Sequence, residues 1–184
     1  MKLKTITTSL LLSFSLYALE LHKVPPHITL AGENGGFFGS NKAWDSQSLV
    51  GDVHVLFYVD PDEKGVNEHY TKALKKFKQE HNYHFKNIAI INLAATWMPN
   101  VVLEKVLASK QKEFKDTLYV KDKNSVLVKK WNLKDDASNV IIFNKKGEVV
   151  FYKSGAMSQK DIQKSFEIIQ EKISKLVYNF KKPS

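Results

Sequence analysis

The stretch Val53-His54-Val55-Leu56-Phe57-Tyr58-Val59 decides the fold of this 184-residue chain. Its apolar and β-branched side chains follow one another almost without interruption, which is typical of a strand buried on both faces of a sheet. A polar turn, 60–65, comes next, and a segment with helical periodicity begins near Asn67. A buried strand that leads into a helix through a short turn is the first half of a β-α-β unit. We therefore predict an α/β fold in which 53–59 is a central strand.

The rest of the chain continues this alternation of strands and helices. Helices are predicted at 67–81, 100–114, 125–131 and from Ser158 onward. Further strands are predicted at 88–93, 117–120, 139–143 and 148–153, and the last two are joined by a hairpin turn that ends in Gly147. Asn67 is predicted to be an N-cap. The glycine-rich stretch 32–39 is predicted to be a loop, because it lacks the Lys-Ser/Thr ending of a phosphate-binding loop.

The first 18 residues have the pattern of a secretory signal. Lys2 and Lys4 precede a short apolar stretch, which ends near the small residue Ala18. That stretch is too short to remain as a membrane anchor, and no other segment is long enough to span a bilayer. We expect the signal 1–18 to be removed. The chain should then be a periplasmic protein with one domain over 19–184, a core at about 40–178 and no integral membrane segment.

Composition excludes two classes of function. The chain contains no cysteine, so it cannot carry out thiol–disulfide exchange, which requires a thiolate. All 28 basic residues are lysines, and the formal net charge is +9. Because nucleic-acid readers usually rely on the guanidinium group of arginine, we expect no nucleic-acid partner. The simple explanation of the lysine excess is a codon or solubility bias toward this residue, and the alternative is weak association with anionic membrane or cell-wall polymers.

The order of the predicted elements is the thioredoxin layout with an inserted helical segment. In the C-terminal half, Ala-Ser-Asn-Val-Ile-Ile-Phe-Asn-Lys-Lys-Gly-Glu-Val at 137–149 and Lys-Ser-Gly-Ala-Met-Ser at 153–158 resemble the YtfJ-type family of exported bacterial proteins. Other positions agree with this resemblance: Trp44, Ser46, Leu49, Gly51, Ile90, Ile91, Asn92 and Trp131. The resemblance implies a thioredoxin-like three-layer fold with a mixed central sheet flanked by helices. It implies a periplasmic location and no established activity.

Both halves of a thiol-exchange site are missing from the sequence. Asp60-Pro61-Asp62-Glu63 occupies the turn where a redox member carries Cys-x-x-Cys, and Ser138-Asn139 occupies the place of its cis-proline. We therefore expect a periplasmic binding or adaptor protein without thiol redox activity. Its partner would be a small ligand or another protein, and no cofactor is expected.

The carboxyl ends of the central strands are the predicted binding region, because ligands of open α/β sheets bind there. Three loops should converge at this end of the sheet. We predict ligand contacts from Asp60, Asp62, Trp97, Ser138 and Asn139, with the Trp97 ring as the floor of a pocket. An alternative interpretation is that Trp97 caps the core.

The acidic turn has a second interpretation. Asp60, Asp62 and Glu63 would serve as acid–base groups or as ligands of a hard cation such as Ca²⁺, making the chain a thiol-independent enzyme or a metal-binding protein. The simpler hypothesis is that acids favour a helix start and that Asp-Pro-Asp is ordinary turn chemistry. The sequence alone therefore assigns no catalytic residue and no metal site.

Overall fold

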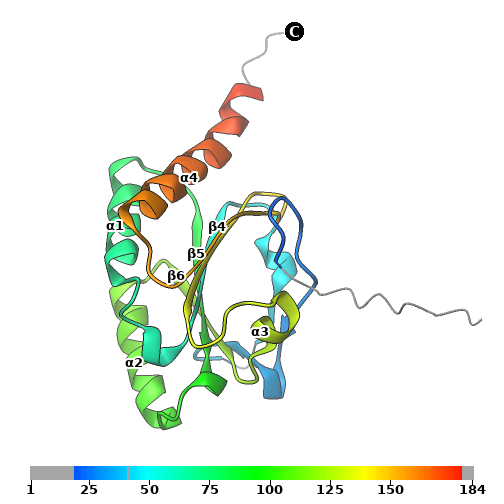
Figure 1. The fold of residues 1–184 in the computed structure, drawn as a ribbon, viewed down its shortest axis with the longest axis vertical. Coiled ribbons are helices and arrows are strands. Elements are labelled where there is room, and N and C mark those ends of the chain that lie inside the picture. The colour runs from blue at the N-terminus through cyan, green and yellow to red at the C-terminus, as the bar shows by residue number, and fades with distance from the viewer. Residues whose placement is uncertain (1–18, 41, 180–184) are drawn as a thin grey trace, which may run out of the picture.

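The computed structural model describes residues 19–40 and 42–179 (Figure 1). The predicted signal, 1–18, lies outside the described residues, as do residues 180–184. No helix within the described ranges is long and apolar enough to cross a membrane.

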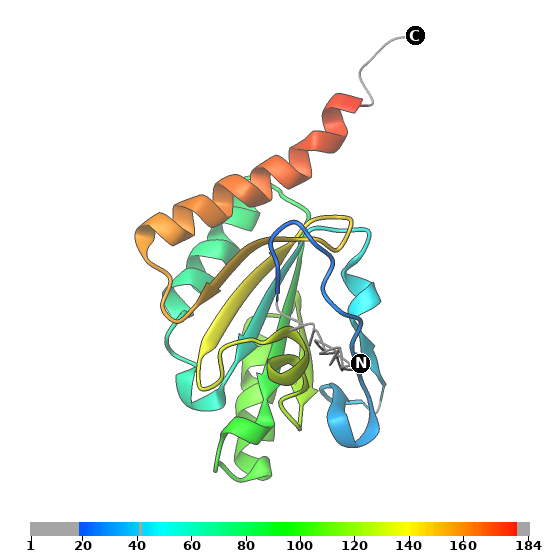
Figure 2. The same cartoon turned by 45° about the vertical axis from the view of Figure 1, so that its right-hand side comes forward.

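A six-stranded mixed sheet forms the centre of the fold (Figure 2), and its strand order is β2-β6-β5-β4-β7-β8. The strands are β2 (Gly35–Phe37), β4 (His54–Val59), β5 (Lys86–Asn92), β6 (Thr117–Asp122), β7 (Ser138–Phe143) and β8 (Val149–Ser154). Strand β4 pairs with parallel β5 on one side and with antiparallel β7 on the other. The predicted central position of this strand is confirmed.

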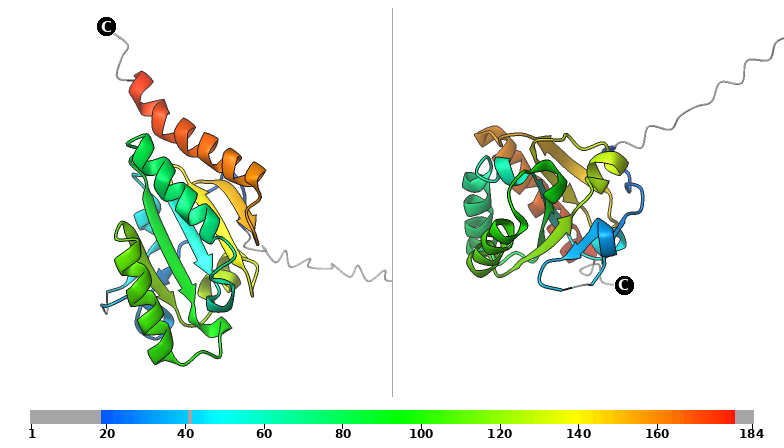
Figure 3. Two further views of the ribbon diagram at one scale, coloured as in Figure 1. Left: turned by 90° about the vertical axis from the view of Figure 1, so that its left-hand side faces the viewer. Right: turned by 90° about the horizontal axis from the view of Figure 1, so that it is seen from below.

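Helices cover both faces of the sheet. They are α1 (Glu68–Glu80), α2 (Asn100–Glu113), α3 (Val126–Trp131) and α4 (Gln159–Asn179). Helices α1, α2 and α4 lie on one face, whereas α3 and the N-terminal segment lie on the other (Figures 1 and 3). Strands β4, β5 and β6 are parallel neighbours. Their two crossovers are α1 and α2, and right-handed crossovers place both helices on the same face.

Alternate side chains of β4 enter two separate hydrophobic layers. Leu56 and Tyr58 pack on the α3 side with Trp131, whereas Val55 and Phe57 pack beneath α1 and α4. Burial of one such side chain contributes about 1.5–3 kcal/mol to the free energy of folding. Because β4 is apolar on both faces, neither layer can be removed without exposing it.

A small two-stranded sheet, β1 (Thr29–Leu30) and β3 (Trp44–Asp45), precedes the main sheet. The carboxylate of Asp45 holds this region together. It accepts hydrogen bonds from the Gln47 backbone N–H at 2.8 Å and the Thr29 hydroxyl at 2.9 Å, and it lies 2.9 Å from His27 Nε2. The Gln47 N–H, followed by the His27 bond, lowers the pKa of Asp45.

The prediction of a loop over 32–39 is wrong for β2. After a 3-10 turn at Gly32–Asn34, this strand pairs antiparallel with β6 at the edge of the main sheet. Gly35 and Gly36 have φ angles of 128° and 130°, which side chains rarely tolerate. A Cβ atom on Gly35 would lie 1.8 Å from the carbonyl oxygen of Lys121. The strand therefore forms because its glycines allow close backbone approach, not because its side chains alternate.

We predict that Gly35→Ala lowers the free energy of unfolding by more than about 2 kcal/mol, because the new methyl group overlaps β6. Gly39→Ala is the matched control: its φ is also positive, at 73°, but no heavy atom lies within 4 Å of the added Cβ. Gly39→Ala should lower the free energy of unfolding by about 1 kcal/mol. Urea denaturation measures both values, and equal losses would contradict the steric explanation.

Candidate functional site

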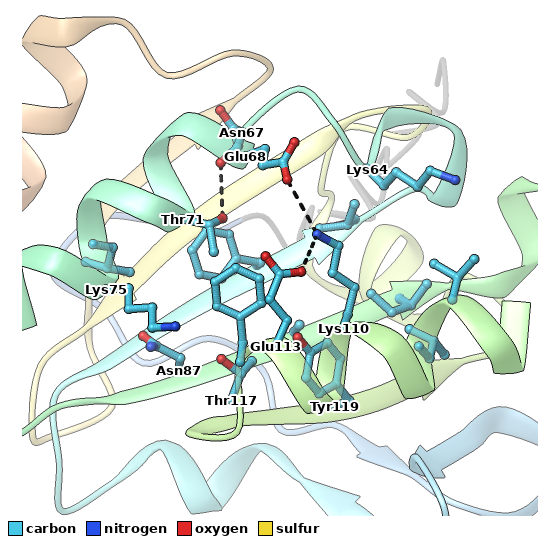
Figure 4. A pocket seen from close by; sticks show the side chains of 18 of the residues that line it. Lys64, Asn67, Glu68, Thr71, Lys75, Asn87, Lys110, Glu113, Thr117 and Tyr119 are labelled. Carbon is cyan, nitrogen blue, oxygen red and sulfur yellow. Dashed lines mark hydrogen bonds and ion pairs between the residues drawn. The ribbon is translucent and has the colours of Figure 1, made fainter.

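A cavity of about 400 Å³ lies between α1, α2 and the sheet beneath them (Figure 4). Its floor comes from β4, β5 and β6, whose residues are in register. Asn87 lies beside Thr117, and Ala89 lies between Phe57 and Tyr119. The small Ala89 side chain between two aromatic residues leaves the space that the two helices enclose.

The two helices supply the walls of the cavity, one face each. Most of the lining residues of α1 recur every three or four positions, as expected for one helix face; the full set is Glu68, Thr71, Leu74, Lys75, Lys78 and Gln79, preceded by the N-cap residue Asn67. Most of the lining residues of α2 follow the same spacing, and the full set is Leu103, Val106, Leu107, Lys110, Lys112 and Glu113. Both helices begin at the carboxyl ends of strands and run back along the sheet. Each therefore places its late, lysine-bearing turns nearer the amino ends of the strands.

A lysine on α2 connects the two walls. Lys110 Nζ lies 3.1 Å from Glu113 Oε2 and 3.6 Å from Glu68 Oε1 on α1 (Figure 4). The Phe114 ring lies next to these charges, with Lys110 Nζ 5.4 Å and Lys75 Nζ 5.5 Å from its centroid. Such partly exposed ion pairs contribute about 0–1 kcal/mol each to the free energy of folding. They therefore orient charges at the cavity more than they hold the helices together.

Two polar groups belong to the cavity floor. The Asn87 Oδ1 atom is buried and has no hydrogen-bond partner among the described residues. Burial raises the pKa of Tyr119 to about 12, with a smaller contribution from the negative charge of Glu113. The Tyr119 hydroxyl therefore stays protonated at neutral pH and can donate a hydrogen bond. An apolar floor with a few such groups is the usual composition of a small-molecule site.

The acidic segment at the end of β4 forms a hydrogen-bonded 3-10 turn. Asp60 is 3% exposed, and its Oδ1 atom accepts a 2.8 Å hydrogen bond from the Asp62 N–H, which caps the 3-10 turn Pro61–Glu63. Burial raises the pKa of Asp60, and the carboxyl groups of Asp62 and Asp136 raise it further. Thr96 Oγ1 donates to Asp62 Oδ1 at 3.3 Å, so the structure brings this turn and the loop after β5 together.

Ser138 and Asn139 are buried, and their side chains bond within the chain. Ser138 Oγ accepts a 2.9 Å hydrogen bond from Asn67 Nδ2. Asn139 Nδ2 donates to the Lys134 carbonyl at 2.9 Å, and its Oδ1 accepts from the Tyr152 hydroxyl at 3.0 Å. Of these two predicted contact residues, only Ser138 lines the cavity.

Asn67 is the N-cap residue of α1, as predicted, but its side chain makes no capping hydrogen bond. Besides its bond to Ser138, it donates to the Gly155 carbonyl at 3.0 Å and accepts from the Met157 N–H at 2.8 Å. The amide therefore connects α1 to β7 and to the segment after β8. Sequence spacing cannot reveal these partners, because they are about 70 to 90 residues away.

Trp97 does not have either of its two predicted positions. Its side chain is 88% exposed, so it does not cap the core, and it is absent from the cavity lining. It lies on the surface before α2, and Val101 in the first turn of that helix is 68% exposed.

The described part of the chain contains no group of three or more His, Asp or Glu side chains placed to hold a metal ion. Three of the histidines lie close to backbone carbonyls: His54 Nδ1 is 3.0 Å from the Asp52 oxygen, His69 Nε2 is 2.8 Å from the Met157 oxygen, and His81 Nδ1 is 3.1 Å from the Phe77 oxygen. Burial lowers the pKa of His54. The acids at the end of β4 are therefore not joined by histidines into such a group.

Sequence reasoning missed the cavity. The signal that indicates it is the pattern within β5, where Asn87, Ala89 and Ile91 share one face and the first two are polar or small. In a strand covered by helices, such side chains leave space unless the helices approach more closely.

Known proteins resemble this chain in sequence and in fold. A family model described as "Bacterial protein of unknown function (YtfJ_HI0045)" matches residues 33–172. The chain is 27% identical to "Uncharacterized protein YtfJ" of Escherichia coli (strain K12) over 135 residues, covering 72% of this chain and 73% of that protein.

Two solved structures resemble the chain at low sequence identity. One is a putative protein disulfide isomerase from Bacteroides thetaiotaomicron, with a TM-score of 0.60 and 18% identity over 86% of this chain and 92% of that one. The other is the exposed lipoprotein thioredoxin of Streptococcus pneumoniae, with a TM-score of 0.53 and 11% identity over 78% of this chain and 99% of that one. They show the fold alone, and the predicted thioredoxin-like fold is confirmed. Because the family model spans well over half of the chain, the chain belongs to the YtfJ_HI0045 family of bacterial proteins.

Proposed function

We propose that this chain is an exported, non-redox binding protein whose small ligand occupies the cavity between α1, α2 and the sheet. The cavity itself carries the proposal: about 400 Å³ above an apolar floor, with a few polar groups at its edges. The absence of cysteine supports binding over redox chemistry, because the thiolate that thiol exchange needs cannot form.

Export is supported by the signal pattern of residues 1–18. It is also supported by the likeness in fold to a protein that is described as an exposed lipoprotein. A periplasmic ligand or partner therefore remains our expectation.

The predicted strand-end site borders this cavity without coinciding with it. Pro61 and Ser138 line one end of the cavity, so a bound molecule would approach the turn that carries Asp60 and Asp62. Ligand contacts from those two acids, from Asn139 and from Trp97 stay predictions from the sequence, as does an adaptor role through the exposed Trp97 ring.

Filling the cavity tests the proposed function. Ala89→Leu adds three carbon atoms to the floor between Phe57 and Tyr119 and should weaken ligand binding at least tenfold, because the occupied volume is lost. The neutral dye 1-naphthylamine, which has 11 non-hydrogen atoms and a fluorescence that depends on the polarity of its surroundings, reports binding to the purified chain by titration.

Ala156→Leu is the control for Ala89→Leu. Ala156 is exposed and does not line the cavity, so the same added volume should leave dye binding unchanged. Circular dichroism verifies that both variants fold. The proposal fails if the wild-type chain does not bind the dye or if the two substitutions have the same effect.

Acid–base chemistry at Asp60 is a second candidate, favoured by one observation. This carboxyl group is buried, and its pKa is raised by that burial and by the neighbouring acids. General acids of enzymes often have perturbed pKa values of this kind.

The raised pKa of Asp60 predicts a specific pH dependence. Ionisation is harder in the folded chain, so the contribution of Asp60 to stability is present below about pH 4 and is lost as the pH rises through the raised pKa. Asn cannot ionise but keeps the oxygen that accepts the Asp62 N–H. The thermal midpoint of Asp60→Asn should therefore increase relative to wild type between about pH 4 and pH 7.

Asp161→Asn is the control, with the opposite sign. Hydrogen bonds from Ser158 lower the pKa of Asp161, so this variant should lose stability relative to wild type as the pH rises through the lowered pKa toward about pH 4, with a constant difference above that pH. Thermal denaturation from about pH 2 to pH 7 measures both. A constant difference between Asp60→Asn and wild type would exclude a raised Asp60 pKa and with it the second candidate.

A further inference from the structure

We propose that the ligand of the cavity is an amphipathic anion, with a carboxylate or phosphate group held near Lys75 and an apolar body directed toward Val59 and Ile91. This inference rests on the proposed function, because it names the chemical class of molecule that the cavity takes.

The cavity floor changes from polar to apolar along the strands. At the amino ends, Asn87 and Thr117 are paired neighbours on β5 and β6. Four residues further along β5, Ile91 is paired with Val59 of β4. All four residues line the cavity. A ligand that is uniformly polar or uniformly apolar would leave one of these ends without a suitable partner.

The α2 wall and the late turns of α1 repeat this polarity, whereas the early turns of α1 also bring Glu68 and Thr71 into the lining. The first turns of α2 contribute Leu103 and Leu107 to the lining, and Leu107 packs in the same cluster as Ile91. The later turns of α1 contribute Lys75 and Lys78. Figure 4 shows Lys75, Asn87 and Thr117 together at one end of the cavity, with the amino group of Lys75 directed toward Asn87.

The charges at the cavity favour an anion over a cation. Six lysines but only three carboxylates are among the lining residues. Lys110 is paired with Glu68 and Glu113, and Lys78 Nζ lies 3.9 Å from Asp116. Within the described ranges, Lys75 has no carboxylate within ion-pair distance; its contact is with the Phe114 ring. An anionic group of the ligand would provide the charged partner that Lys75 lacks.

The buried Oδ1 atom of the half-buried Asn87 is the second observation that points to a polar ligand group at this end. Its Oδ1 atom is buried without a hydrogen-bond partner in the described chain, and leaving such an atom unpaired is unfavourable. The Nδ2 group of this amide can donate a hydrogen bond to a carboxylate or phosphate oxygen, whereas Oδ1 needs a donor, such as a water molecule that hydrates the anion. A hydrated anionic group therefore suits this end better than the end of a hydrocarbon chain.

The volume limits the size of the ligand. With about 30 Å³ for each water-sized group, a cavity of about 400 Å³ holds on the order of 13 non-hydrogen atoms. Decanoate, with about a dozen, is a suitable probe. Decan-1-ol and decyltrimethylammonium carry the same chain with a neutral and a cationic head group.

The experiment measures how these three probes displace 1-naphthylamine from the full chain at low ionic strength. We expect decanoate to displace the dye at about tenfold lower concentration than the alcohol, and the cation to be the weakest of the three. Lys75→Gln should raise the Kd of decanoate about tenfold, with a much smaller effect on decan-1-ol.

Lys76→Gln is the matched control. Lys76 lies on the same helix but outside the cavity lining, and its exposed amino group lies 3.6 Å from Glu80. The Lys76→Gln substitution removes the same charge from the chain as Lys75→Gln. Equal losses of decanoate affinity in the two variants would therefore show a general effect of net charge and overturn the inference.

The outcomes separate this inference from the proposed function. If the alcohol displaces the dye as well as decanoate does, the inference fails although the cavity still binds apolar molecules. If the wild-type chain does not bind the dye, or if Ala89→Leu does not weaken dye binding, the proposed function fails first.

Discussion

Strand β4 is apolar on both faces, so it is stable only with a layer on each side. Leu56 and Tyr58 require the layer that contains α3, and Val55 and Phe57 require the layer of α1 and α4. A shift of the strand by one residue would exchange the two sets of side chains, which the different layers do not allow. This constraint sets the direction of the chain as it leaves β4 and therefore the positions of α1 and of the acidic turn at Asp60.

The cavity is a consequence of that layered arrangement. Parallel pairing of β4, β5 and β6 requires a crossover between each pair of strands, and α1 and α2 are those crossovers, placed next to each other on one face. Beneath them, β5 presents Asn87 and Ala89 where bulkier apolar side chains would fill the space. The position of the cavity thus follows from topology, and its volume and polarity follow from a few side chains of β5.

The end of the sheet where redox relatives of this fold perform thiol chemistry is closed here by internal hydrogen bonds. Asn67 bonds with Ser138, Gly155 and Met157, and Asn139 bonds with the loop before β7 and with Tyr152. These amides stabilise the loops that a thiol site would require to be accessible. In this cysteine-free chain the strand end is therefore bonded internally, and the cavity lies beneath the helices.

The sequence by itself determined the central strand, the order of the strands and helices that follow it, the family resemblance and the exclusion of thiol exchange. These depend on local periodicity and on residue types, which can be read over a few positions. Only the tertiary structure decided that Gly35 belongs to a strand, that Asn67 bonds across the molecule, that Trp97 is exposed and that α1 and α2 enclose a cavity. Each of these depends on contacts between groups from segments far apart in the chain, and local sequence patterns carry no information about such contacts.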